Sequence, residues 1–164
     1  MSHPTFAFSD SPEVKTPASQ FKVVRIGEPA PPMDVDQPHL SQAYWFSRIA
    51  TSEWFDADKE HLVAITLNTR LRATGFNLIS IGSLNETIAG PREIMRPVIV
   101  AAAAAFVLMH NHPSGDPTPS SSDQRLTQRI KQCADLFCIT FVDHVIVGRT
   151  AADPRHSFRE TGLL

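Results

Sequence analysis

One short segment, His110 to Asp123, constrains this 164-residue chain more than any other part of its sequence. It reads HNHPSGDPTPSSSD and follows the apolar run Phe106–Met109, which predicts a buried strand. Residues two apart on an extended strand point to the same side, so His110 and His112 are expected to converge. Pro113 then ends the strand, and Asp123 falls in the first turn of the next predicted helix.

Two imidazoles and one carboxylate form a donor set that is typical of zinc. When three protein ligands hold the ion, the fourth tetrahedral position is left for water, which is the pattern of a catalytic site. We therefore predict that His110, His112 and Asp123 bind a metal. A structural alternative stays open, because Ser120 and Asp123 also have the spacing of a helix capping box, and one residue could serve both roles.

Hydrolysis at a zinc site also needs a base that accepts a proton from water. Three glutamates are candidates for this base. Glu60 stands just before an apolar strand, Glu86 lies in a loop, and Glu93 falls in a predicted first helical turn. The helix dipole alone would explain a carboxylate in that first turn. Spacing does not choose among the three.

The rest of the chain alternates strands and helices, which predicts an α/β or α+β domain built around one sheet. Strands over His61–Asn68 and Thr74–Ile81 are expected to pair across a short turn. A helix is expected to open at Gly90–Pro91 and to continue through Ala101–Ala105, with a kink or a later start at Pro97. The other predicted elements are helices over Leu40–Phe55 and Ser120–Leu136 and a strand over Cys138–Val147.

The distribution of proline predicts the domain boundary. Seven of the thirteen prolines fall in the first 40 residues, and proline disfavours regular structure because it lacks a backbone donor. Residues 1–39 are therefore expected to form a Pro-rich extended or disordered lead, and residues 40–164 the folded domain. Phe21–Ile26 (FKVVRI) is an exception, since its composition suits a strand that could dock on a sheet edge.

Charge and cysteine content narrow the class of protein. The formal net charge of −2 indicates no broad basic surface for nucleic acid. The only cysteines are Cys133 and Cys138, which excludes a disulfide-rich secreted module. The N-terminus does not read as a secretory signal, and the longest apolar run, Val98–Met109, is too short to cross a bilayer. A cytoplasmic protein with no membrane partner is therefore expected.

Several separated motifs together resemble the RadC-like family of JAB/MPN metallohydrolases, whose signature is the JAMM motif. These motifs are GSLNETIAGPREI, HNHPSGDPTPSSSD and DHVIVG, and they occur in the family's order within residues 55–164. The resemblance implies the JAB/MPN fold, a central mixed sheet flanked by helices that is similar to the fold of cytidine deaminases. A deaminase itself is disfavoured because the chain contains no P-C-x-x-C segment.

The family motif H-x-H-x7-S-x2-D falls on His110, His112, Ser120 and Asp123. The resemblance implies that the two histidines and the aspartate hold one zinc ion per chain. It also implies that Ser120 stabilises the tetrahedral oxyanion. The family's upstream glutamate corresponds to Glu60, with a leucine in place of the usual aromatic residue two positions on, so Glu60 is the expected general base.

The chain is thus expected to be a zinc-dependent hydrolase of the metallopeptidase or isopeptidase type, using a metal-activated water. A DNA-repair-associated accessory protein and a non-catalytic MPN-like scaffold are the alternatives. The near-neutral charge and the Pro-rich lead, which replaces the helical DNA-binding region of many relatives, weigh against a DNA partner. The peptide or isopeptide substrate is not encoded in any pattern, and a homodimer is left open. Asp143 and His144 match a family Asp-His pair that either supports the ligands or is a satisfied core pair.

Overall fold

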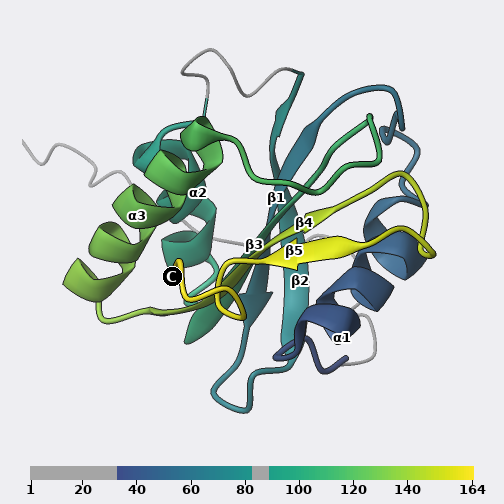
Figure 1. The fold of residues 1–164 in the computed structure, drawn as a ribbon. Coiled ribbons are helices and arrows are strands. Elements are labelled where there is room, and N and C mark those ends of the chain that lie inside the picture. Colours follow the sequence, from purple (N-terminus) through teal and green to yellow (C-terminus); the bar gives the residue numbers. More distant parts are fainter. Residues whose placement is uncertain (1–32, 83–88) are drawn as a thin grey trace, which may run out of the picture.

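The computed structural model describes residues 33–82 and 89–164, which form one sheet flanked by helices (Figure 1). Three sequence expectations lie wholly or mostly outside the described residues, namely the Pro-rich lead over residues 1–39, the strand-like segment Phe21–Ile26 within it, and the loop that carries Glu86. In chain order, the elements are α1 (Pro38–Tyr44), the π-helical turn η1 (Trp45–Ile49), β1 (His61–Leu67), β2 (Ala73–Ile81), α2 (Pro91–Val100), β3 (Ala105–Asn111), α3 (Ser121–Leu136), β4 (Thr140–Val147) and β5 (Arg155–Ser157).

In the part of the chain that the structure describes, five strands form a mixed sheet in the order β2-β1-β3-β4-β5. Strand β1 pairs antiparallel with both β2 and β3, β3 pairs parallel with β4, and β5 pairs antiparallel with β4. The parallel pair is joined through α3, because parallel strands need a long crossover connection. The predicted fold class, a mixed sheet flanked by helices, and the predicted antiparallel pairing of the first two strands are both confirmed.

The central strands β1 and β3 are buried along their whole length, which explains why their sequences are mostly apolar. One face of the sheet packs against α1 and η1 through a cluster that includes Val63, Val107 and Trp45. The opposite face packs against α2 and α3 through a cluster that includes Leu108 and Ile130. Figure 1 shows α2 and α3 on one side of the sheet and α1 on the other. Strand β3 is therefore fixed in the middle of three layers.

The first helix differs from its predicted range. It begins at Pro38 rather than Leu40 and ends with η1 at Ile49, whereas the prediction ran to Phe55. The side chain of Phe55 instead packs on the ring of His61, with the two ring centroids 4.7 Å apart. The aromatic residues at the end of the predicted helix therefore cover the start of β1 from a loop.

Packed structure begins upstream of residue 40. The main-chain N–H of Ala73 donates to the carbonyl of Met33 at 2.9 Å, and Asp34 forms an isolated bridge with Arg72. Val35 is buried in the core beside α1. The residues just before α1 are thus tied to the beginning of β2.

The expectation that the second helix continues through Ala101–Ala105 is wrong. Helix α2 ends at Val100, and Ala105 is already the first residue of β3. The helix propensity of alanine exceeds that of most residues by at most about 0.7 kcal/mol. The main-chain N–H of Ala104 instead donates to the carbonyl of Leu67 at 3.0 Å, at the end of β1. Pairing at the sheet therefore overrides the local preference for helix.

Two further boundaries also depart from expectation. Helix α2 starts at Pro91 and runs through Pro97, so the alternative of a later start is not observed. The strand predicted from Cys138 begins at Thr140, because Cys138 has a φ of 54°, a left-handed conformation that lies outside strand geometry. Within residues 33–82 and 89–164, we find no helix with the length and apolar character needed to span a membrane.

Candidate metal centre

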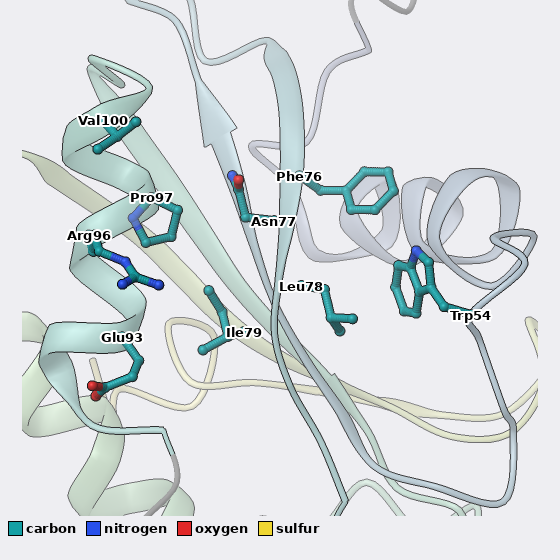
Figure 2. Close-up of a pocket in the computed structure, with 9 residues that line it drawn as sticks. All are labelled: Trp54, Phe76, Asn77, Leu78, Ile79, Glu93, Arg96, Pro97 and Val100. Carbon is teal, nitrogen blue, oxygen red and sulfur yellow. The ribbon is translucent and has the colours of Figure 1, made fainter. Parts of the chain in front are cut away.

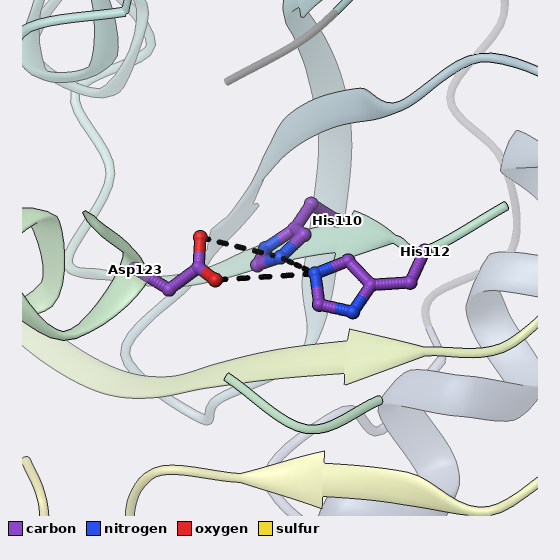
Figure 3. A group of neighbouring side chains, drawn as sticks. All are labelled: His110, His112 and Asp123. Carbon is purple, nitrogen blue, oxygen red and sulfur yellow. Dashed lines mark hydrogen bonds and ion pairs between the residues drawn. The ribbon is translucent and has the colours of Figure 1, made fainter. Parts of the chain in front are cut away.

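His110 and His112 lie at the C-terminal end of β3, in the middle of the sheet. His110 pairs with Leu62 of β1 on one side and with β4 on the other. His112 directly follows the strand, and its main-chain N–H donates to the carbonyl of Val147 at 2.9 Å. Because this bond continues the strand geometry, both imidazoles point toward the same place (Figure 3).

Asp123 reaches the two histidines from the first turn of α3. Ser120 caps this helix, since its hydroxyl accepts the N–H of Asp123 at 3.2 Å. In return, Oδ2 of Asp123 accepts the N–H of Ser120 at 2.8 Å. This is the capping box that the sequence offered as a structural alternative. The other oxygen of the same carboxylate, Oδ1, lies 3.5 Å from Nε2 of His110, so capping α3 leaves Asp123 able to serve as a metal ligand as well.

The three candidate ligands are close enough to share one metal ion (Figure 3). The Nε2 atoms of His110 and His112 are 3.0 Å apart. Oδ1 of Asp123 is 3.5 Å from Nε2 of His110, and Oδ2 is 3.9 Å from Nε2 of His112. Ligand atoms at about 2.0–2.1 Å from a tetrahedral zinc ion are separated by about 3.3 Å. The observed separations lie on both sides of this value, so the donors fit zinc after small movements.

Burial keeps His110 in the neutral form that binds metals. Its pKa is lowered to about 4, chiefly by desolvation, although the Asp123 carboxylate acts in the opposite direction. Nδ1 of His112 lies 2.7 Å from the main-chain carbonyl of Asp116, which can only accept a hydrogen bond. Nδ1 of His112 therefore carries the proton of the neutral ring, and its Nε2 presents a lone pair to the site.

Glycine residues shape the loop that precedes α3. Gly115 has a φ of 87°, which favours glycine because a side chain would be strained there. A Cβ added to Gly148, just after β4, would lie 2.8 Å from the carbonyl oxygen of Gly115 and 2.6 Å from Cβ of Asp153. Only glycine at position 148 allows this close approach to Gly115, the residue that precedes Asp116 in the loop.

Ser120 is adjacent to the candidate ligands. In addition to capping α3, its hydroxyl donates to Oδ2 of Asp123 at 2.6 Å. The structure thus places Ser120 next to the candidate metal ligands. Its role as a donor to an oxyanion stays a prediction.

Glu60 stands at the same end of the sheet as the histidine pair. It immediately precedes β1, which pairs with β3 beside His110. Asn111 ties the two strands together at this point. Its side-chain oxygen accepts the N–H of His61 at 2.9 Å, and its side-chain nitrogen donates to the carbonyl of Lys59 at 2.9 Å. The main chain around Glu60 is therefore anchored to β3, and its role as general base stays a prediction.

Glu93 has the structural role that its sequence position suggested. Its Oε2 accepts the N–H of Gly90 at 3.1 Å and so caps α2. The same residue lines a groove of about 560 Å³ that lies between α2, β2 and Trp54 (Figure 2). None of the three candidate ligands lines this groove. Glu93 is thus associated with a different part of the surface.

Two buried polar residues extend the site beyond the triad. Nε2 of His144 lies 2.9 Å from Nδ1 of His110, and Oγ1 of Thr127 lies 2.6 Å from Nδ1 of His144. The sequence leaves the role of His144 open and does not single out Thr127. The available signal was that Thr127 follows Asp123 by one helical turn and therefore lies on the same face of α3.

A family profile described as RadC-like JAB domain matches residues 40–163. The chain belongs to this family. The assignment confirms the resemblance carried by the three sequence motifs. The mixed sheet with helices on both faces is consistent with a JAB domain.

Relatives of this RadC-like JAB domain include several proteins named UPF0758 protein. The protein from Pelodictyon phaeoclathratiforme is 41% identical over 109 residues, which cover 66% of this chain and 48% of the relative. The protein from Chlorobium chlorochromatii is 43% identical over the same coverage. The protein from Thermotoga maritima is 40% identical over 107 residues, which cover 65% and 47%. The chain therefore spans about half the length of these relatives.

Proposed function

We propose that this RadC-like JAB domain is a zinc-dependent hydrolase of amide bonds, of the metallopeptidase or isopeptidase type. One observation carries the proposal: two imidazole nitrogens and a carboxylate meet at separations of 3.0 to 3.9 Å at the end of a buried strand. A set of three protein ligands leaves a fourth zinc position open, as catalytic sites require. Membership of a JAB family supports the same reading.

Zinc bound here would act as a Lewis acid that lowers the pKa of water and polarises a carbonyl. Glu60 would accept the proton of the attacking water and pass it to the leaving amine. The position of Glu60 supports this role, because Glu60 lies at the end of the sheet that also carries His110. The hydroxyl of Ser120 would donate to the developing oxyanion, for which it must turn away from Oδ2 of Asp123.

Zinc content and hydrolysis test these assignments separately. The full chain purified with zinc should hold one zinc ion per chain by elemental analysis. The His112→Ala protein should lose the ion, because it lacks one of three ligands. The Glu60→Gln protein should keep zinc but hydrolyse about 10²–10⁴-fold more slowly, as expected when a general base is removed. A mixture of fluorogenic peptides and lysine isopeptides serves as substrate, and Glu53→Gln, at an exposed position, is the matched control.

Each result has a clear consequence. Full zinc content in the His112→Ala protein would refute the ligand assignment. Equal hydrolysis by wild type and Glu60→Gln would refute the assignment of the base. A wild-type protein that holds zinc yet cleaves none of the substrates would favour the non-catalytic alternative.

DNA association and a homodimer remain predictions. Among the cations of α3, Lys131 pairs with Asp135 at 3.5 Å, and Arg125 donates to the hydroxyl of Ser122 at 3.0 Å. These local partners suit a solvated helix surface. Titration with single- and double-stranded DNA at near-physiological salt tests the first prediction, since phosphate contacts give salt-dependent binding.

A further inference from the structure

We propose that Thr127 and His144 are positioning residues that fix the tautomer and the orientation of His110 for metal binding. The inference rests on the proposed zinc site and adds two residues to it. Both residues are fully buried. They act through His110 rather than by touching the ion.

His144 reaches His110 from the neighbouring parallel strand. It pairs with Leu108 of β3, so it lies two residues along the same face of the sheet from His110. Nε2 of His144 is 2.9 Å from Nδ1 of His110. The His144 ring also stacks on Phe158, with centroids 4.8 Å apart and planes at 12°. The ring plane of His144 is thus held on its face as well as at its edge.

The Asp123 carbonyl can only accept a hydrogen bond, and this fixes the donor and the acceptor in each bond from Thr127 through His144 to His110. Oγ1 of Thr127 lies 2.7 Å from the main-chain carbonyl of Asp123, to which its hydroxyl must donate. Because that uses its only proton, Oγ1 must accept from Nδ1–H of His144 at 2.6 Å. Nε2 of neutral His144 is then bare and accepts from Nδ1–H of His110. Nε2 of His110 is left with a free lone pair, directed at His112 and Asp123.

This series of hydrogen bonds starts at Asp123 and ends at His110, which are both candidate ligands. Asp123 supplies a carboxylate to the site and a carbonyl to the hydroxyl of Thr127, one helical turn further on. Without that hydroxyl, the proton of His144 can move to Nε2, and His110 can then carry its own proton on the nitrogen that must bind the ion. An imidazole nitrogen that carries a proton cannot ligate a metal.

A purely structural role for the two residues makes a different prediction. Loss of a buried hydrogen bond would lower the melting temperature but would leave the zinc affinity of the folded protein unchanged. A positioning role lowers zinc affinity by about 10–100-fold, as is typical of groups that orient a metal-binding histidine.

Thr127→Val tests the proposal because it removes the hydroxyl and keeps the shape of the side chain, whereas Thr127→Ser restores the hydroxyl. Zinc affinity of the full chain is measured by competition with a chromophoric chelator, and the absorption spectrum of the cobalt(II)-loaded protein reports ligand geometry. Circular dichroism verifies folding without metal. We expect the valine variant to bind zinc about 10–100-fold more weakly with a changed cobalt spectrum, and the serine variant to resemble wild type.

Thr161→Val is the matched control. The hydroxyl of Thr161 also donates to a carbonyl four residues back, that of Ser157 at 2.8 Å, and also contacts a histidine ring, Nε2 of His156 at 3.3 Å. The hydroxyl of Thr161 also lies 3.3 Å from the carbonyl of Phe158, but its hydrogen bonds are made to neither His144 nor the three candidate ligands. Zinc affinity and the cobalt spectrum should therefore match those of wild type.

If Thr127→Val does not fold, the variants His144→Gln and His144→Leu replace it. The glutamine oxygen can accept from Nδ1–H of His110, so we expect tighter zinc binding in His144→Gln than in His144→Leu. Equal zinc affinity of Thr127→Val and Thr127→Ser, or of His144→Gln and His144→Leu, overturns the inference. The proposed function is unaffected by either result. A wild-type chain that binds no zinc overturns the proposed function and this inference with it.

Discussion

Acid should destabilise the metal-free protein, because the fold buries His110 as a neutral imidazole. Burial lowers the pKa of His110 from 6.5 to about 4. Between these values, the unfolded chain binds a proton that the folded protein excludes, so the free energy of unfolding falls as the pH falls. His144 contributes with the same sign, since burial lowers its pKa well below the usual value.

The size of the effect follows from the difference between the two pKa values. The step from 6.5 to about 4 corresponds to about 3 kcal/mol at about 1.4 kcal/mol per pH unit. Between pH 7 and pH 5, His110 alone should lower the free energy of unfolding by about 2 kcal/mol. Asp143 has the opposite sign, because burial raises its pKa and the folded state therefore takes up that proton first.

Urea denaturation of the full chain in the presence of a chelator, followed by tryptophan fluorescence at pH 7, 6 and 5, measures this dependence. The His110→Leu protein should show a shallower dependence on pH, because it lacks the buried titrating group. The His39→Gln protein, altered at an exposed histidine, should retain the wild-type dependence. Equal free energies of unfolding at pH 7 and pH 5 for wild type would refute the reasoning.

Two further substitutions probe how the site is built. Ser120→Ala should lower the free energy of unfolding by about 1 kcal/mol, because α3 loses its N-cap; unchanged urea denaturation would contradict the capping role. Gly148→Ala should cost about 1–3 kcal/mol, because its Cβ would lie 2.6 Å from Cβ of Asp153. Gly75→Ala is its control, since a Cβ there would meet only Oγ1 of Thr66 at 3.9 Å, and equal stability of the two alanine variants would argue against the close packing.

The candidate ligands could be predicted from the sequence because their arrangement is largely local. His110 and His112 follow a buried strand at the spacing that puts side chains on one side, and Asp123 occupies a recognisable position at a helix start. Strand alternation and helix capping are short-range rules. They place the two histidines on one side of a strand and Asp123 at a helix start, and the packing of α3 on the sheet then brings the carboxylate to the imidazoles.

The partners of these ligands depend on long-range pairing and could not be predicted in the same way. His144 meets His110 only because β3 and β4 pair in parallel with Leu108 opposite His144. No spacing in the sequence encodes that register. The end of α2 shows the same limit. The run Ala101–Ala105 favours helix locally, but Ala105 is the first residue of β3.

Asn111, the residue between His110 and His112, has a structural role of its own. Side chains alternate along a strand, so the residue between the two ligands projects away from them, and its amide holds the main chain on either side of Glu60. Asn111 therefore binds the main chain around Glu60 to β3, in addition to separating the two histidines. A shift at the end of β3 would carry the two candidate histidine ligands and the segment around Glu60 together, so the separation between them is set by adjacent strands and not by a loop.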